Sequence, residues 1–343
     1  MKAIVWRGGE DMRLESVADP RPAPGQVLVR IAVTAICGSD LHLPEFRAVP
    51  PVIPGHEAAG TVVECGAGVT RPSPGDRVVL DPVQRCGTCI PCSSGFDHLC
   101  ENTRHLGSGT CPGTWAELVV ADAANAHALP DRVGFAAASL VEPAAVCRHS
   151  LQRARVEPGA AVLVMGDGPF GFFHAQWART LGVRKLVVAG HHEPRLRRIR
   201  EATGAATCDT TRQDLEALVR DVAGPAGMDV AIEASGSGDA PGQAIPLLRP
   251  RGTLVVFSYI WSPRALDMGA IHMKELSLVG SCRSLDAFSP CIEAIAQGSL
   301  RPDLLLDARF PIVRFQEALS LLRADRDRLF KVALEPDAES ARR

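Results

Sequence analysis

The chain has 343 residues, of which 46% are hydrophobic and 22% charged, a composition typical of a globular protein with a substantial core. Its formal net charge of −2 argues against a general attraction to nucleic acid or acidic membrane surfaces. No apolar run is long enough for a signal peptide or a membrane-spanning helix. We therefore expect a cytoplasmic protein without membrane partners, whose 11 cysteines do not form a disulfide framework.

The first part of the chain predicts a β-rich domain. Short β-branched runs occur over 27–36, 60–66 and 75–80, and turn residues separate them at short intervals. We expect this domain to comprise residues 1–150 and to include residues 285–343, which contain two helical patterns and a final strand.

The middle of the chain, residues 151–284, has a different pattern of predicted elements. Buried-type strands alternate with helical patterns, and this alternation predicts a doubly wound parallel sheet, so the protein is expected to be α/β. The strands are expected over 156–166, 185–190, 228–236 and 252–258.

Four cysteines lie close together in residues 86–100, which read CGTCIPCSSGFDHLC. Two consecutive Cys-x-x-Cys steps and a fourth thiol can wrap a tetrahedral ion, and a shell of four thiolates is typical of structural zinc. Unrelated core thiols or an iron–sulfur cluster are the alternatives. The short, polar lobe favours zinc, with the ligands Cys86, Cys89, Cys92 and Cys100.

A second set of metal-ligating residues is distributed over CGSDLH (37–42), GHE (55–57) and VEP (141–143). Cys37, His56 and a carboxylate could hold Zn²⁺ and leave one position open, which is the pattern of a catalytic zinc. Taken singly, each residue is weak evidence, because a lone cysteine or histidine is more often a core residue.

The segment GDGPFG follows an apolar strand and opens a helical pattern. In that context, a GxGxxG spacing is the fingerprint of a dinucleotide site, where the helix N-terminus receives the phosphates. The predicted cofactor-binding residues here are Gly166, Gly168, Pro169, Phe170 and Gly171.

The end of the next strand bears on which nicotinamide cofactor is used. An NAD enzyme usually has Asp or Glu there for the ribose 2′-hydroxyl, whereas this chain has Gly190, followed by His191. The missing carboxylate and the nearby Arg195 favour NADP(H). Alternatively, Glu193 or a backbone group could serve the ribose of NAD, with the arginines forming an exposed helix face.

The order of these motifs resembles that of the zinc-containing medium-chain dehydrogenases over nearly the whole chain. GHE and VEP are similar to the sorbitol (polyol) and threonine dehydrogenase branch, whereas alcohol dehydrogenases proper have a cysteine as the third ligand. The resemblance implies a GroES-like catalytic domain with an inserted Rossmann domain, and two zinc ions per chain. It also implies a homodimer or homotetramer that pairs Rossmann sheet edges, with 252–259 as the candidate edge strand.

The resemblance also implies roles for individual residues. Cys37, His56 and Glu57 would be zinc ligands, and Glu142 either a fourth ligand or the residue that holds the metal-bound water. Ser39 would hydrogen-bond the substrate hydroxyl, and His42 would pass the proton to solvent through the cofactor ribose. Asp40 would orient His56. The candidate substrate contacts are Phe46, Trp115 and Arg283.

Several alternatives remain open for these residues and for the activity. Arg283 could instead form a salt bridge, and the two aromatic residues could be core. The expected activity is hydride transfer between a secondary alcohol (a polyol, sugar or aminocyclitol) and NAD(P). Its rivals are an L-threonine-type amino-alcohol dehydrogenase and an NADPH-dependent ketone reductase of a biosynthetic pathway. A redox sensor that binds dinucleotide without catalysis is the rival from another class.

Overall fold

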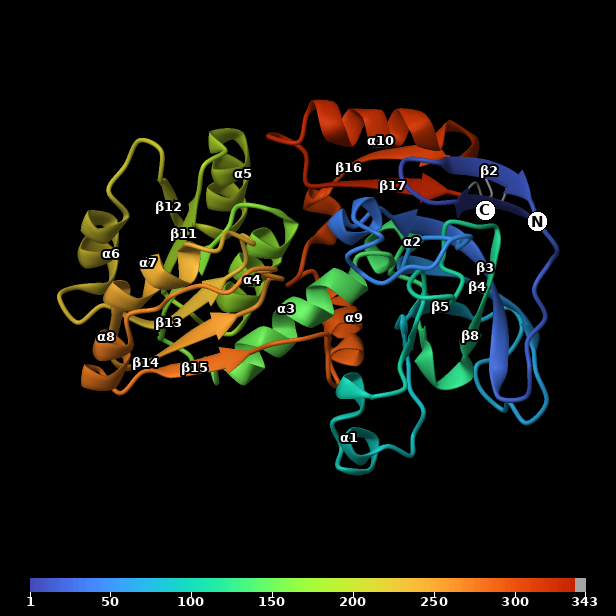
Figure 1. The fold of residues 1–343 in the computed structure, drawn as a ribbon, viewed down its shortest axis with the longest axis horizontal. Coiled ribbons are helices and arrows are strands. Elements are labelled where there is room, and N and C mark those ends of the chain that lie inside the picture. Colours follow the sequence, from blue (N-terminus) through green and yellow to red (C-terminus); the bar gives the residue numbers. More distant parts are fainter. Residues whose placement is uncertain (337–343) are drawn as a thin grey trace. The chain divides into compact units, whose positions relative to one another are not determined.

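The computed structural model describes residues 1–336, which form two compact units (Figure 1). The first unit comprises Met1–Glu142 and the segment from Phe288 onward, and the second comprises Pro143–Ala287. The border at Glu142 falls inside helix α3 (Val141–Arg153), so no turn or linker marks it in the sequence.

The main sheet of the first unit has the strand order β16-β17-β3-β4-β5-β9 among the described residues, and β8 also pairs with β3. The longest pair, β3 with β4, is antiparallel, and β17 joins the other side of β3. Alternate side chains of β3, β5 and β8 face a common apolar core, whereas β16 and β17 pack into a second cluster. The strands are β3 (Gln26–Ala35), β4 (Glu57–Cys65), β5 (Arg77–Leu80), β8 (Leu118–Asp122), β9 (Ala126–Ala128), β16 (Leu306–Pro311) and β17 (Lys331–Glu335).

Shorter elements complete the first unit. Strand β1 (Lys2–Trp6) pairs with β2 (Met12–Ser16), and β6 (Val83–Gln84) pairs with β7 (Arg104–His105). The α-helices are α1 (Ile90–Ser93), α2 (Phe135–Ala138), α9 (Phe288–Ala296) and α10 (Phe315–Ala324). The 3₁₀ turns are η1 (Gly38–Leu41), η2 (Asp97–Leu99), η3 (Ala123–Asn125), η4 (Pro302–Leu304) and η5 (Ile312–Arg314).

The second unit contains the predicted parallel sheet, with the order β12-β11-β10-β13-β14-β15 over its described residues. Its strands are β10 (Ala161–Met165), β11 (Lys185–Gly190), β12 (Ala206–Asp209), β13 (Met228–Glu233), β14 (Leu248–Val256) and β15 (Ser277–Gly280). The expected edge strand, 252–259, was wrong, because β14 lies between β13 and β15. The edge is β15, a strand of only four residues whose short pattern gives little signal.

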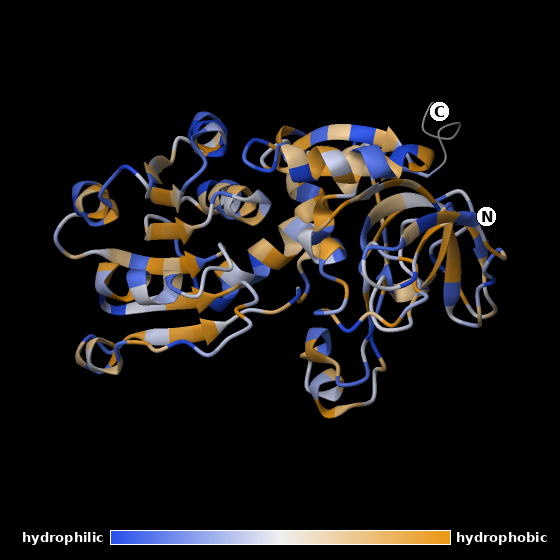
Figure 2. Ribbon diagram, turned by 45° about the horizontal axis from the view of Figure 1, so that its top comes forward, coloured by the Kyte–Doolittle hydropathy of each residue, from blue (hydrophilic) through white to orange (hydrophobic). Residues whose placement is uncertain are grey.

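Helices cover the sheet of the second unit on both faces, as an all-parallel sheet requires. Apolar residues of α6 (Leu215–Ala223), α7 (Ala240–Leu247) and α8 (Met268–Met273) pack with one set of alternating strand residues. The other helices are α3, α4 (Pro169–Thr180) and α5 (Glu193–Thr203), and α4 contacts both β10 and α5. The strands are mostly hydrophobic in Figure 2, whereas the helices carry hydrophilic stretches.

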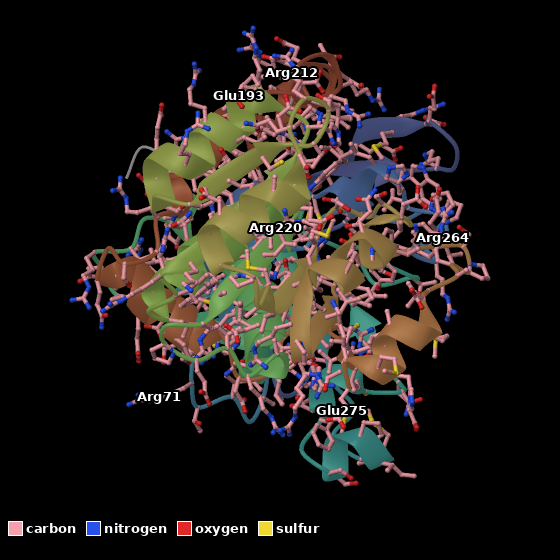
Figure 3. The ribbon with its side chains drawn as sticks, turned by 90° about the vertical axis from the view of Figure 1, so that its left-hand side faces the viewer. Arg71, Glu193, Arg212, Arg220, Arg264 and Glu275 are labelled. Atoms are coloured by element: carbon pink, nitrogen blue, oxygen red, sulfur yellow. The ribbon has the colours of Figure 1, made fainter. Side chains whose placement is uncertain are left out.

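Charged side chains project from the outside of the second unit, where Arg220 and Glu193 are labelled in Figure 3. Several of them pair locally: Arg220 with Glu216 at 2.8 Å, and Glu193 with Arg200 at 3.1 Å. Over residues 1–336, none of the helices has both the length and the apolar character needed to cross a membrane.

Candidate active site and metal sites

A single 3₁₀ turn carries four of the residues singled out in the sequence. Cys37 lies two residues after β3 and is the N-cap of η1, and its backbone N–H donates to Asp40 Oδ2 at 2.9 Å. Ser39 accepts a hydrogen bond from the His42 N–H through its carbonyl oxygen. Cys37 and Asp40 are buried, whereas 65% of the His42 side chain is exposed. The turn therefore extends from the interior to the surface.

The start of β4 places two further residues beside this turn: Glu57, its first residue, and His56, which precedes it. Donor atoms of Cys37, His56 and Glu57 all lie within 4.8 Å of one another. His56 Nδ1 is 3.3 Å from Asp40 Oδ1, so Nε2 is the ring nitrogen left for a metal. Burial lowers the pKa of His56, but the neighbouring Asp40 carboxylate outweighs it and the pKa is raised well above its usual value.

A thiol, an imidazole and a carboxylate in one buried cluster form a donor set that suits zinc. The three donor atoms need to move by only about an ångström to reach the spacing of a zinc shell, which is roughly 3.3–3.8 Å for bonds near 2.0–2.3 Å. The residues therefore fit the ion.

Lys331, which no pattern in the sequence singles out, also belongs to this cluster. Its ammonium group is buried and lies 2.5 and 2.7 Å from the two carboxylate oxygens of Glu57. It also donates to the Ile36 carbonyl oxygen at 3.3 Å. Burial lowers the pKa of Lys331, but the Glu57 carboxylate more than compensates, and the pKa is raised. A buried carboxylate requires such a counter-charge.

Glu142 lies in the first turn of α3 and acts electrostatically on the same cluster. Burial raises its pKa to about 7, with His56 and Lys331 lowering it and Glu57 raising it. It does not belong to the group of three whose donor atoms converge among the described residues. The structure thus brings Glu142 near the site without placing it in the cluster.

The residue before His56 is a glycine that packs closely against Trp115. Gly55 has φ +93°, and a Cβ there would collide with Trp115. Trp115 is completely buried and packs in a core cluster with Ile4 and Ile53. Its expected place in a substrate-pocket wall is therefore wrong, because it supports the turn that precedes His56. His105 lies edge-on to His56 with ring centroids 5.4 Å apart.

The other expected substrate contacts are partly buried. Phe46 follows η1, and its carbonyl oxygen accepts a hydrogen bond from Ser108 Oγ at 2.8 Å. Arg283 lies in the loop after β15, in the second unit, with a left-handed φ of 57°.

The four cysteines of the lobe lie in and around α1 and η2. Ligand atoms of Cys86, Cys89, Cys92 and Cys100 all lie within 4.8 Å of one another. The sulfurs of Cys89 and Cys100 are 3.8 Å apart, which is the edge of a tetrahedron with zinc–sulfur bonds of about 2.3 Å. Backbone N–H groups of Thr88 and Cys89 lower the pKa of Cys86 to about 5, which favours its thiolate. The lobe therefore fits a closed tetrahedral ion.

The glycine-rich turn joins β10 to α4. Gly168 is the N-cap of α4 and Pro169 its first residue. Gly166 has φ +136°, and a Cβ on Gly171 would collide with the Gly166 carbonyl oxygen, so both positions require glycine. The ring of Phe170 packs edge-on against Phe257 at 5.1 Å. The open N-terminus of α4 presents backbone N–H groups to an anion.

The end of β11 has a carboxylate beside it, although residue 190 is a glycine. Asp167, the second residue of GDGPFG, is buried and accepts hydrogen bonds from the backbone N–H groups of His191 and His192 at 2.8 and 2.7 Å. Its other oxygen lies 3.8 Å from Arg195. Glu193 points away to pair with Arg200. The carboxylate absent from Gly190 is thus supplied by another residue.

Comparisons with known proteins agree with this arrangement. The alcohol dehydrogenase GroES-like domain matches residues 23–131, and the zinc-binding dehydrogenase domain matches residues 169–297. Sorbitol dehydrogenase from Bombyx mori is 30% identical over 94% of this chain and 95% of its own length.

Two solved structures share the fold. An alcohol dehydrogenase from Escherichia coli CFT073, complexed with NADH, superimposes with a TM-score of 0.92 at 27% identity, covering 98% of this chain and 99% of that one. A putative zinc-binding dehydrogenase from Sinorhizobium meliloti 1021, bound to NADP, gives 0.89 at 27% identity, with 98% and 99% covered.

These matches cover both units and agree with the sequence motifs. The expected combination of a GroES-like domain with a Rossmann-like domain is confirmed. The chain therefore belongs to the zinc-containing medium-chain dehydrogenase/reductase family, near its polyol dehydrogenase branch, and is an NAD(P)-dependent alcohol or polyol dehydrogenase.

Proposed function

We propose that Cys37, His56 and Glu57 hold a catalytic zinc ion at which a secondary alcohol, of the polyol class, exchanges a hydride with the nicotinamide. The observation that carries this proposal is the convergence of these three donors within 4.8 Å in a buried cluster. When bound, zinc lowers the pKa of a coordinated hydroxyl group and polarises the corresponding carbonyl. A cluster of only three ligands leaves a position for the substrate.

The protein groups around this cluster would move the proton that accompanies the hydride. Ser39 would hydrogen-bond the substrate hydroxyl, and His42, which is exposed, would pass the proton to solvent through the cofactor ribose. Asp40 would hold His56 through Nδ1 and so fix the ring nitrogen that faces the metal.

Two acidic residues would act at the metal, Glu57 as the third ligand and Glu142 beside it. Lys331 engages both oxygens of Glu57, so Glu57 can bind zinc only while sharing its carboxylate with the ammonium group. Glu142, with a pKa raised by burial, would be a fourth ligand or the acceptor for the metal-bound water. A second, structural zinc in the lobe of Cys86, Cys89, Cys92 and Cys100 would bring the content to two ions per chain.

The GDGPFG turn, with Gly166, Gly168, Pro169, Phe170 and Gly171, would receive the pyrophosphate of the cofactor. Gly190, His191 and Arg195 would lie beside the adenosine ribose. Because residue 190 carries no carboxylate, we favour NADP(H) over NAD(H), and a strong preference for NAD(H) in kcat/KM would contradict this choice.

The polyol class is proposed because a relative that matches 94% of this chain is a sorbitol dehydrogenase. Phe46 would be one wall of the pocket and Arg283 a polar contact, which suits a substrate with several hydroxyl groups.

For its setting, we propose a cytoplasmic homodimer or homotetramer. The edge strand β15 has unpaired backbone groups along one side and an exposed Leu278, so it can accept the same strand of a second chain.

The experiment that tests the proposal combines metal analysis of the purified protein with a panel of polyols, amino alcohols and aminocyclitols, each with both cofactors. Two zinc ions per chain and turnover of at least one polyol are expected. Cys37→Ser should abolish turnover while cofactor still binds, and Cys65→Ser, at the far end of β4, is the matched control. Unchanged turnover in Cys37→Ser would contradict the catalytic zinc.

A further inference from the structure

Asp167 is an acidic residue within the glycine-rich turn, and only 4% of it is exposed. It lies two residues after the end of β10, inside the turn that leads to the N-terminus of α4. A negative charge here works against phosphate binding unless other groups neutralise it. The partners of Asp167 therefore decide what it does.

All of its described partners come from the segment that follows β11. Oδ2 accepts the backbone N–H groups of His191 and His192, and Oδ1 lies 3.0 Å from His192 Nδ1. The Arg195 guanidinium is 3.8 Å from Oδ1. Backbone N–H groups, an imidazole and a guanidinium form a set that binds phosphate well. In this chain, a carboxylate from the glycine-rich loop already engages that set.

Gly190 is coupled to the same carboxylate. A Cβ at residue 190 would collide with the carboxylate of Asp167, so no acidic side chain can stand at the end of β11 while Asp167 points there. The negative charge beside the end of β11 therefore comes from the glycine-rich loop and not from the strand. A carboxylate is therefore present at the ribose end of the site, and it is hydrogen-bonded to His191 and His192.

We propose that Asp167 is a built-in counter-charge that limits how strongly this site binds a 2′-phosphate. Gly190 and Arg195 favour the phosphate by leaving space and supplying positive charge, and Asp167 opposes it by engaging the same donors and repelling the incoming dianion. The preference for NADP(H) is then modest in the wild-type protein, and its size is set by residue 167. This inference rests on the proposed dinucleotide site at GDGPFG.

The test uses two ligands that differ only in the 2′-phosphate, AMP and 2′,5′-ADP, titrated calorimetrically into the full-length protein. Asp167→Asn removes the charge and keeps an oxygen that can accept the two N–H groups. We expect the affinity for 2′,5′-ADP to rise about tenfold, the scale of one charge-assisted interaction. The affinity for AMP should change by less than about threefold.

Glu216→Gln is the control, because it removes one carboxylate from the exposed ion pair with Arg220 in the same unit. It should leave both affinities unchanged. Thermal unfolding verifies that each variant is folded, and Asp167→Ser is the substitute if Asp167→Asn does not fold.

An unchanged ratio of the two affinities in Asp167→Asn would overturn the proposal. A parallel loss of both ligands would also overturn it, because Asp167 would then serve the ribose or the loop structure. If the wild-type protein binds neither ligand, the dinucleotide site itself is wrong, and that outcome is distinct from the other two. The kcat/KM ratio for NADPH over NADH should rise together with the affinity ratio.

Discussion

The Lys331 ammonium group and the Glu57 carboxylate form a buried ion pair, with both carboxylate oxygens within 2.7 Å of Nζ. The side chains are 3% and 0% exposed. Strand β17 supplies the lysine and β4 the glutamate, and β3 lies between these two strands in the sheet. The pair therefore bridges across β3 and fixes the carboxylate at the metal-binding cluster.

Removing only the lysine should be costly. In Lys331→Met, Glu57 stays buried without a counter-charge, and we expect a loss of about 3–5 kcal/mol in the free energy of unfolding. Denaturant unfolding of metal-free protein measures this loss without a contribution from zinc. The double variant Lys331→Met/Glu57→Gln should recover at least half of it, because no charge is left unpaired. Equal losses in the single and double variants would show that the ion pair is not the cause.

The proton path makes a separate prediction. Ser39→Ala should lower kcat by about 10²-fold or more, because proton transfer by a positioned group contributes on that scale. The zinc content and the affinity for the cofactor should stay the same. Ser73→Ala, an exposed serine before β5, is the matched control. A Ser39→Ala enzyme with wild-type kcat would exclude this serine from the path.

The four-cysteine lobe should act on stability and not on chemistry. Cys92→Ser removes one thiolate from a closed shell, so metal analysis should find about one zinc ion fewer per chain. The melting temperature should fall, because the lobe has little apolar core of its own and the metal supplies its folding energy. Initial turnover per remaining zinc should be close to that of the wild type. Loss of both ions together would mean that the two sites do not form independently.

His174 predicts a specific pH dependence of stability. Complete burial lowers its pKa from 6.5 to about 4, while its Nδ1 lies 2.7 Å from the Phe170 carbonyl oxygen. Above pH 6.5 both the folded and the unfolded states hold a neutral ring. As the pH falls from 6.5 toward 4, only the unfolded state gains a proton, so the free energy of unfolding falls by on the order of 3 kcal/mol in total.

The measurement is chemical denaturation of the wild type and of His174→Gln at several pH values. Other groups titrate in both proteins, so the difference between the two curves isolates this histidine. The difference in free energy of unfolding between wild type and variant should shrink between pH 6.5 and 4. In this range only the wild type is destabilised by protonation of residue 174 in the unfolded state. A constant difference would contradict the assigned shift.

The sequence predicted the parts of this molecule that repeat a local pattern. A few neighbouring residues are enough to identify the strands beside the GDGPFG turn, and the same is true of the four-cysteine lobe. Turns and metal lobes need particular residues at fixed spacing. It could not predict Lys331, which lies in an apolar strand and whose partner is 274 residues away. Nor could it predict the role of Asp167, because GxGxxG leaves the second position unspecified. Trp115 was expected in the substrate pocket but lies in the core, because the sequence around an aromatic residue does not distinguish these two positions.

The distance in sequence between Glu57 and Lys331 has a consequence for biosynthesis. Glu57 leaves the ribosome early, among the strands of the first unit, but its ammonium partner follows 274 residues later, after the whole second unit has emerged. During that interval the carboxylate has no counter-charge from β17, and the first unit lacks strands β16 and β17. The nascent chain therefore completes its nucleotide-binding unit before Lys331 can pair with Glu57, and a product cut short before β17 would keep the three metal-binding residues but lack the counter-charge of Glu57.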